Sequence, residues 1–276
     1  METDGTRTLM LFAEFTDGYC LRNLIEYAKS TNTSGNFIFT PDKILYARAD
    51  ANSTLVNEFI ISACNLSYYE YRSEEPEIAV GIKLSDLRSI TKSIGRKDGL
   101  RIRMYQGDPL FHLEIVTSNT KGMNRNNENT LRPQTVSEPG YEVGEYAVDS
   151  QPNYKISVAD FCRSCMSMNS IKCSSVLISC YPNSITFEGT LEGGIVGRRD
   201  FYHRLPDGQP ETGEPTRTLR VRVNIIKSLS KLVNVCNGTG VIRFFLGLDE
   251  ANDPLRLRCK IGAIGHLNIY LQEAEP

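Results

Sequence analysis

Two stretches of the chain share one pattern: FIFTPDKILY at residues 37–46 and ISCYPNSITF at residues 178–187. Pro41 matches Pro182 and Ile44 matches Ile185, at a constant offset of 141 residues. In both stretches an apolar run leads into a Pro-Asx turn and a second apolar run follows, which predicts a β-hairpin. A hairpin repeated at a fixed offset indicates that the chain consists of two related halves.

The repeat continues on the C-terminal side of each hairpin. Residues 82–116 match residues 221–261, with Leu87 opposite Ile226 and Gly99 opposite Gly240. Each half therefore reads as helix, strands, second helix and closing hairpin. The alternation of apolar and charged residues at 101–104 and 255–258 predicts half-buried antiparallel strands. The predicted helices cover residues 18–31, 84–95, 158–171 and 223–236.

The length of 276 residues fits two domains, at about 150 residues each. Between the halves, residues 118–139 are rich in Asn and Pro and poor in apolar residues, which predicts a loop or linker. No apolar run approaches the roughly 18–20 residues of a membrane helix, and the N-terminus has no secretory signal pattern. We therefore expect no membrane association.

Charge is distributed unevenly along a chain whose net charge is only −2. The predicted helices and their exits carry ten bases and three acids, a net +7, which leaves −9 for the rest. Arg88, Lys92 and Arg96 are four residues apart, as are Lys227 and Lys231, so each set forms a stripe on one helix face. One such stripe is ordinary on a solvated helix, but four related basic helices favour a non-specific phosphate-binding surface.

Catalytic and metal-binding patterns are missing from the sequence. The three histidines, His112, His203 and His266, do not lie in a nucleophile–base arrangement, and no phosphate-binding loop or zinc-protease motif occurs. Cys162 and Cys165 form a single C-x-x-C, which we interpret as a pair of buried helix residues. We expect no enzyme activity, no cofactor and no metal.

A family resemblance becomes visible at the end of the chain. The stretch KIGAIGHLNIYL at residues 260–271 resembles the closing segment of the proliferating cell nuclear antigen (PCNA) family of DNA sliding clamps. Residues 175–180, 185–189 and 192–194 resemble the hairpin of the clamp's second domain, and residues 80–84 also fit. The resemblance covers roughly residues 18–116 and 156–271 and suggests a divergent member of the family, for which a large DNA virus is one expected source.

The resemblance implies an α+β DNA-clamp fold of two duplicated domains, each with antiparallel sheet and two helices, assembling into a closed ring. The expected partners are double-stranded DNA, two further copies in a homotrimer, a DNA polymerase, a clamp loader and other proteins with PIP-type peptides. The expected location is the nucleus, or the site of viral DNA replication. By position in the family, the DNA-facing bases are Arg22, Lys29, Lys92, Arg163 and Lys231, and helix spacing adds Arg88, Lys172 and Lys227. Asn23, Ser89 and Met166 stand where the family often has further bases.

The resemblance also implies a pocket for partner peptides and an interface between subunits. The positions that match the pocket are Ala49, Leu55, Pro254 and Tyr270. The interface is expected at an edge strand within residues 141–149 and at an opposing edge over residues 188–201. Its candidate residues are Tyr141, Val143, Tyr146, Val148, Leu191 and Ile195.

The junction between the halves has two interpretations. In the first, residues 141–149 are the last strand of an N-terminal domain at 1–148, residues 118–140 are a loop insertion, and residues 149–155 connect it to a C-terminal domain at 156–276. In the second, the whole stretch is a long connector. We favour the first.

The sequence therefore predicts a DNA sliding clamp, a polymerase processivity factor that encircles duplex DNA and tethers replication and repair enzymes. One alternative is a clamp-like subunit that acts as a monomer or in a mixed, checkpoint-type ring. A second is a nuclease or DNA-modifying enzyme that uses dispersed acids.

Overall fold

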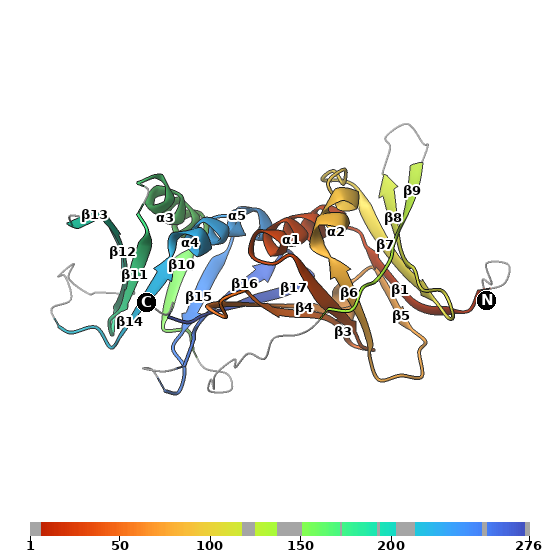
Figure 1. The fold of residues 1–276 in the computed structure, drawn as a ribbon, viewed down its shortest axis with the longest axis horizontal. Helices are drawn as coiled ribbons and strands as arrows, with labels where there is room; N and C mark the ends of the chain where they lie inside the picture. Colours follow the sequence, from red (N-terminus) through yellow and green to blue (C-terminus); the bar gives the residue numbers. More distant parts are fainter. Residues whose placement is uncertain are drawn as a thin grey trace. The chain divides into compact units, whose positions relative to one another are not determined.

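The chain divides into two units of helices packed on antiparallel strands in the computed structural model (Figure 1). The model describes residues 7–117, 125–136, 151–171, 173–191, 194–202, 213–249 and 253–273. Unit 1 comprises residues 1–48, 58–139 and 261–266, and unit 2 comprises residues 49–57, 140–260 and 267–276. The predicted boundary at residue 148 lies outside the described residues. Each unit takes a short segment from the other half of the sequence.

Local hydrogen bonds explain the two exchanged segments. The turn at 262–264 belongs to unit 1, where the Ser62 amide donates to the Ile264 carbonyl at 3.2 Å. Residues 49–57 belong to unit 2, where the Gln272 amide donates to the Thr54 carbonyl at 3.0 Å.

The first half of the chain forms the elements of unit 1. A five-stranded sheet has the order β5-β1-β7-β8-β9, and a second run of strands has the order β4-β3-β2-β6. The elements are β1 (Leu9–Phe15), α1 (Gly18–Thr31), β2 (Ser34–Phe39), β3 (Lys43–Ala49), β4 (Leu55–Ser62), a 3-10 turn (Ala63–Asn65), β5 (Tyr68–Tyr71), β6 (Ile78–Lys83), α2 (Leu84–Thr91), β7 (Gly99–Tyr105), β8 (Phe111–Thr117) and β9 (Arg125–Leu131).

Unit 2 repeats this plan. One sheet has the order β13-β12-β11-β14, and a second run has the order β10-β15-β16-β17. The elements are β10 (Tyr154–Ser157), α3 (Val158–Ser170), β11 (Ser175–Cys180), β12 (Ser184–Leu191), β13 (Gly194–Tyr202), β14 (Arg217–Arg222), α4 (Val223–Leu229), α5 (Leu232–Val235), β15 (Val241–Phe245), β16 (Leu255–Ile261) and β17 (Gly265–Leu271). No helix in the described part of the chain is long and apolar enough to cross a membrane.

Both predicted hairpins are confirmed. In unit 1, Phe39 pairs with Ile44 across the β2–β3 turn, and the Thr40 amide donates to the Lys43 carbonyl at 2.9 Å. In unit 2, Cys180 pairs with Ile185 across the β11–β12 turn, and the Tyr181 amide donates to the Ser184 carbonyl at 2.8 Å. The duplication read from the sequence is therefore a duplication of local structure.

Two of the four predicted helices end differently from the prediction. The helix predicted to reach residue 95 ends at Thr91, where the Ile94 amide donates to the Thr91 carbonyl at 3.0 Å and begins a tighter turn. The Asp98 carboxylate then accepts from the Gly95 amide at 2.7 Å. The helix predicted over 223–236 is split into α4 and α5. At the split, the Lys231 amide donates to the Ser228 carbonyl, three residues back, and the Ser230 hydroxyl donates to the Lys227 carbonyl at 2.7 Å.

The prediction of a loop over residues 118–140 is wrong for residues 125–131, which form β9. This strand pairs with β8 from Phe111↔Leu131 to Thr117↔Arg125. Its sequence, RNNENTL, has three asparagines and therefore reads as loop. The free edge of β8 nevertheless supplies hydrogen-bond partners for its backbone, so the tertiary context outweighs the weak strand propensity.

The chain after β9 packs closely on β6. The Gln134 amide donates to the Gly81 carbonyl at 2.9 Å, and the Asn36 side chain donates to the Val136 carbonyl at 3.3 Å. A Cβ atom at residue 81 would lie 2.0 Å from the Gln134 oxygen, so only glycine fits there. We name residues 132–136 the strap.

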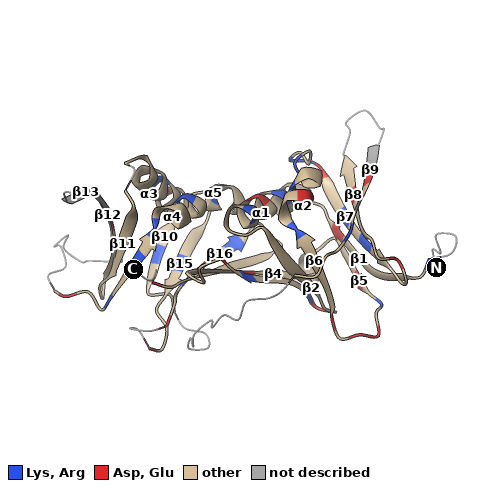
Figure 2. Ribbon diagram, viewed as in Figure 1, with Lys and Arg blue, Asp and Glu red and all other residues tan. Residues whose placement is uncertain are grey.

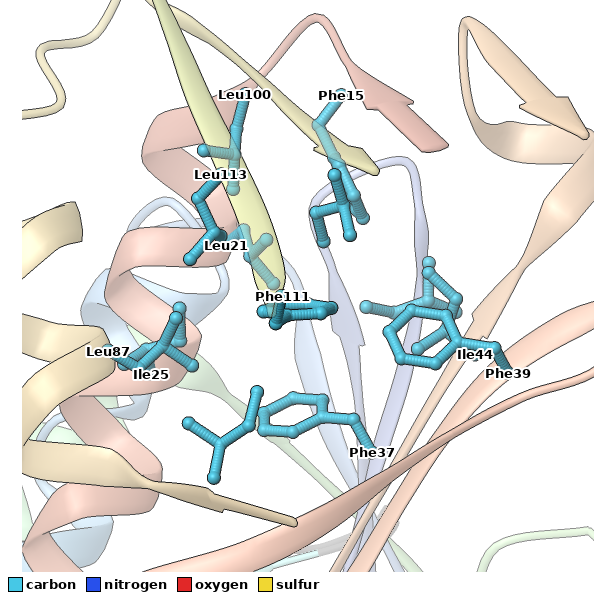
Figure 3. A pocket seen from close by; sticks show the side chains of 13 residues that line it. Phe15, Leu21, Ile25, Phe37, Phe39, Ile44, Leu87, Leu100, Phe111 and Leu113 are labelled. Carbon is cyan, nitrogen blue, oxygen red and sulfur yellow. The ribbon is translucent and has the colours of Figure 1, made fainter. Parts of the chain in front are cut away.

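The core of unit 1 lies between its helices and its two runs of strands. Leu21 and Ile25 of α1 and Leu87 of α2 point toward Phe37 of β2 and Phe111 of β8 (Figure 3). The space that they line has only apolar walls, so it is a part of the hydrophobic core and offers no polar group to a ligand.

Candidate nucleic-acid interface

Helix α1 has a buried face and a polar face. Asp17 caps its N-terminus, with the carboxylate accepting from the Cys20 amide at 2.9 Å. Leu21, Leu24, Ile25 and Ala28 are among its buried residues. The polar face carries Arg22, Asn23, Glu26 and Lys29, of which Lys29 is exposed.

Arg22 makes two contacts within unit 1. Its guanidinium donates to the Ile94 carbonyl at 2.7 Å and lies 5.4 Å from the centre of the Tyr19 ring. Arg96 lies against the same ring, at 5.9 Å. Two guanidinium groups therefore lie against one aromatic ring where the chain leaves α2, and Arg96 follows the helix instead of continuing its basic stripe.

Helix α2 supplies one neutralised base and one exposed base. Arg88 forms a two-pronged ion pair with Glu26 of α1, with Nη2 3.0 Å from Oε1 and Nε in contact with Oε2. This bond raises the pKa of the Arg88 guanidinium further above its ordinary value, through the hydrogen bond and the charge of Glu26. Lys92, at the C-cap, is exposed.

Helix α3 begins in a reciprocal cap in unit 2. The Ser157 hydroxyl accepts from the Asp160 amide at 3.1 Å and donates to the Asp160 carboxylate at 2.6 Å. Arg163 pairs with Asp160 at 3.0 Å on the solvent side. Met166, where the resembling family often has a base, is 50 % exposed.

The last two helices carry Lys227 and Lys231. Lys227 is exposed on α4, and Lys231 is half-buried at the N-cap of α5. The break at Ser230 interrupts the regular four-residue stripe that the sequence suggested. Lys172 lies outside the described residues.

Ion pairing separates the predicted DNA-facing bases into two groups. Arg88 and Arg163 are matched by acids on the helices, whereas Lys29, Lys92 and Lys227 form no ion pair with any residue that the structure describes. All three of these lysines are exposed. Figure 2 shows Lys and Arg on the helices of each unit. Among the described helix residues, the exposed bases without an ion pair to a described residue are therefore Lys29 and Lys92 in unit 1 and Lys227 in unit 2.

The predicted peptide-pocket residues all lie in unit 2. Ala49, Leu55 and Tyr270 are 3 %, 1 % and 4 % exposed, and Pro254 is buried. Ala49 and Tyr270 form a small apolar cluster with Val56, not with Leu55. Consecutive strand residues point to opposite faces, so Leu55 and Val56 cannot share a face. This alternation was the signal in the sequence that could have identified Val56 as the neighbour of Ala49 and Tyr270.

Only two of the predicted subunit-interface residues lie in the described part of the chain. Tyr141, Val143, Tyr146 and Val148 lie outside the described residues. Leu191 ends β12, Ile195 lies in β13, and neither side chain is among those described. Both β9 in unit 1 and β13 in unit 2 pair on one side only within the described sheets.

The C-x-x-C pair lies on the buried face of α3. Burial raises the pKa of the Cys162 thiol to about 12 and that of Cys165 well above its ordinary value. Both thiols are therefore protonated at neutral pH. Among the described residues no cluster of three or more His, Cys, Asp or Glu side chains could hold a metal ion.

Comparisons with known proteins place the fold. No family model matches the chain, and no curated protein matches it. Among solved structures, it is similar to proliferating cellular nuclear antigen from Entamoeba histolytica, with a TM-score of 0.73 and 18 % identity over 96 % of this chain and 99 % of that chain. It is also similar to a PCNA2–PCNA3 complex from Sulfolobus tokodaii, with a TM-score of 0.74 and 15 % identity over 96 % of this chain and 100 % of that chain. The chain thus has the PCNA-like clamp fold.

Proposed function

We propose that this chain is a subunit of a DNA sliding clamp, a ring that encircles duplex DNA and serves as a processivity factor for a polymerase. The observation that carries the proposal is the repeated placement of exposed lysines on helices of both units: Lys29 and Lys92 in unit 1 and Lys227 in unit 2. In a PCNA-like fold, such helices form a surface suited to phosphate groups.

The charge pattern supports contact with the DNA backbone rather than reading of bases. Lysines are point charges on flexible stems and attract phosphates without selecting a sequence. Two of the predicted DNA-facing bases, Arg88 and Arg163, are paired with acids, which lowers the net positive charge of the helices and favours a loose hold compatible with sliding. Retention on DNA then depends on closing the ring and on salt concentration more than on contact affinity.

Ring closure needs two complementary sheet edges in each subunit. We propose that β9 supplies one edge, in place of residues 141–149, and that β13 supplies the other. Among the described strands each pairs on one side only, and pairing head to tail between copies would satisfy the backbone groups of the other side. Three copies of 31.0 kDa have a mass of about 93 kDa.

Tethering is the proposed role toward other proteins. Partner peptides of the PIP type are expected to bind on the surface of unit 2 above Ala49, Leu55, Pro254 and Tyr270, which are themselves buried, and a bound enzyme gains effective concentration at the DNA. A clamp of this kind acts where DNA is replicated, in a nucleus or at a site of viral replication. The proposal includes no catalytic step by this chain.

Native mass by light scattering over a dilution series tests the proposal first. We expect about 93 kDa at micromolar concentration and a fall toward 31.0 kDa on dilution. Retention on circular DNA, with release after the circle is linearised, tests encirclement. A trimer that binds linear and circular DNA equally would contradict the clamp.

A second candidate is a clamp subunit that assembles with different partners. It is favoured by the similarity to a complex of two different clamp chains, PCNA2 and PCNA3. A mass of 31.0 kDa at every concentration would select this candidate.

A further inference from the structure

Three cations lie directly opposite one another across three adjacent strands of unit 2. Lys155 of β10 pairs with Arg243 of β15, and Arg243 pairs in turn with Arg258 of β16. Residues in such register project from the same face of a sheet, with strands 4.7–4.9 Å apart as a typical spacing. We name Lys155, Arg243 and Arg258 the cation row.

The cation row lies on the face of the sheet opposite to α3. Phe244, next to Arg243 in β15, packs its ring 5.7 Å from Phe161 of α3. Because neighbouring strand residues point to opposite faces, Arg243 points away from that helix. The row is therefore separate from the helix lysines on which the proposed function rests.

Further residues of the same two strands enlarge the basic face. Lys260 follows Arg258 by two residues and is exposed. Val241 precedes Arg243 by two residues and is 37 % exposed, so an apolar side chain adjoins the charges. Figure 2 shows Lys and Arg along β15 and β16.

The cation row has no anionic partner in the part of the chain that the structure describes. Lys155, Arg243, Arg258 and Lys260 form no salt bridge with a described residue, in contrast to Arg101 and Arg103 of unit 1, which pair with Glu14 and Glu114. Like charges placed directly opposite in a sheet destabilise it. An arrangement that costs folding energy and has no anionic partner among the described residues is suited to an external anion.

The chemistry of the face distinguishes between two kinds of anion. Proteins that bind single-stranded nucleic acid usually offer exposed aromatic rings to the bases. Here Phe245 is only 5 % exposed and is covered by Arg256, whose guanidinium lies 4.2 Å from the ring centre. Guanidinium groups beside an exposed valine instead suit carboxylates alternating with apolar side chains.

We propose that the cation row is a docking surface for an acidic peptide segment of a partner protein. The carboxylates of that segment pair with Lys155, Arg243 and Arg258, and an apolar side chain packs on Val241. This surface is independent of DNA encirclement and of the peptide cluster at Ala49 and Tyr270.

A labelled peptide of sequence EELEELEE provides the probe, with QQLQQLQQ as the uncharged match. By fluorescence anisotropy at 50 mM salt, we expect the full-length chain to bind the acidic peptide at least tenfold more tightly than the glutamine peptide. The double variant R243E/R258E is expected to bind the acidic peptide at least fivefold more weakly than the natural chain.

The matched control is R220E/R222E, which makes the same change in net charge at exposed positions of β14 in the same unit. We expect it to bind within twofold of the natural chain. Equal losses in the two double variants would overturn the proposal, as would equal binding of the two peptides. Loss of binding to a 12-nucleotide dT strand by R243E/R258E, with peptide binding intact, would also overturn it and assign the face to nucleic acid.

Thermal unfolding supplies a readout that is independent of any ligand. Because Arg258 is repelled by Arg243, R258E is expected to raise Tm, whereas R220E has no such repulsion to relieve. A fall in Tm for R258E would mean that Arg258 is engaged within the fold, and the docking surface would be excluded.

Discussion

Two buried tyrosines differ in whether the hydroxyl has a partner. The Tyr46 ring is 1 % exposed and stacks on Phe59 at 4.6 Å, and its hydroxyl has no hydrogen-bond partner among the described residues. Burial raises the pKa of this phenol, so it stays neutral. The Tyr154 hydroxyl, in contrast, donates to the Tyr181 carbonyl at 2.6 Å.

This difference predicts opposite effects for one substitution. Tyr46→Phe removes an unsatisfied polar group, so the free energy of unfolding is expected to stay the same or to rise by up to about 1 kcal/mol. Tyr154→Phe removes a made bond and is expected to cost about 1 kcal/mol. Urea denaturation of the two variants measures both values, and an equal loss in the two would contradict the assignment of partners.

The Asp108 carboxyl is expected to make the stability of unit 1 depend on pH in the acid range. Hydrogen bonds from the His112 ring at 3.0 Å and the Leu110 amide at 2.9 Å hold the pKa of this carboxyl below its ordinary value, and the Arg7 guanidinium adds a favourable charge. A carboxyl with a depressed folded-state pKa contributes stability above its unfolded pKa of about 3.9 and loses it as the pH falls through the folded value.

The variant Asp108→Asn tests this contribution. It is expected to be less stable than the natural chain at pH 7 and to lose less stability between about pH 4 and pH 2, because the titrating group is gone. Thermal melts across that range give the slope of Tm against pH for the variant and for the natural chain. Parallel slopes in the two proteins would show that Asp108 does not supply the acid sensitivity.

At the scale of elements, the helices carry both matched and unmatched bases, and the proposed DNA contact depends on the unmatched ones. The double variant K92Q/K227Q removes two exposed lysines. The proposed trimer would lose six such lysines, and if two of the six contact phosphates at a time, the variant is expected to lower the salt slope of DNA retention by about two and to weaken retention by roughly tenfold at moderate salt.

The Glu26–Arg88 ion pair offers a control variant with the same number of substitutions. The double variant E26Q/R88Q removes one acid and one base, so the net charge of the helix surface is unchanged. Its retention on circular DNA is expected to stay within about twofold of the natural chain, since no unmatched base is lost. If both double variants behave alike, the exposed lysines are not the DNA contacts.

The elements also show where a sequence pattern predicts structure and where it does not. Helix α1 agrees with its predicted range because its caps and apolar spacing are all local. Strand β9 was missed because its asparagine-rich residues have no strand signal of their own and pair with β8. After α2 the chain turns through the bonds of the Ile94 amide to the Thr91 carbonyl and of the Gly95 amide to the Asp98 carboxylate, which a helix periodicity does not contain.

At the scale of the whole molecule, the proposed assembly predicts a stability that depends on concentration. If β9 and β13 pair between copies, the folded state is stabilised by mass action, and Tm rises with protein concentration. Melts over a hundredfold concentration range check this. A constant Tm together with a single mass near 31.0 kDa would favour a chain that acts alone or with other partners.

The sequence by itself determined the duplication, the two hairpins, the position of α1 and α3, and the basic character of the helices, because each rests on residues close together in the chain. Only the tertiary structure decided that residues 125–131 form a strand, that Gly81 receives the strap, and that Lys155, Arg243 and Arg258 stand in one row. These features join residues tens of positions apart. Strand pairing and close backbone approach depend on which distant segments the fold brings next to a residue. The propensity of the local sequence does not contain that information.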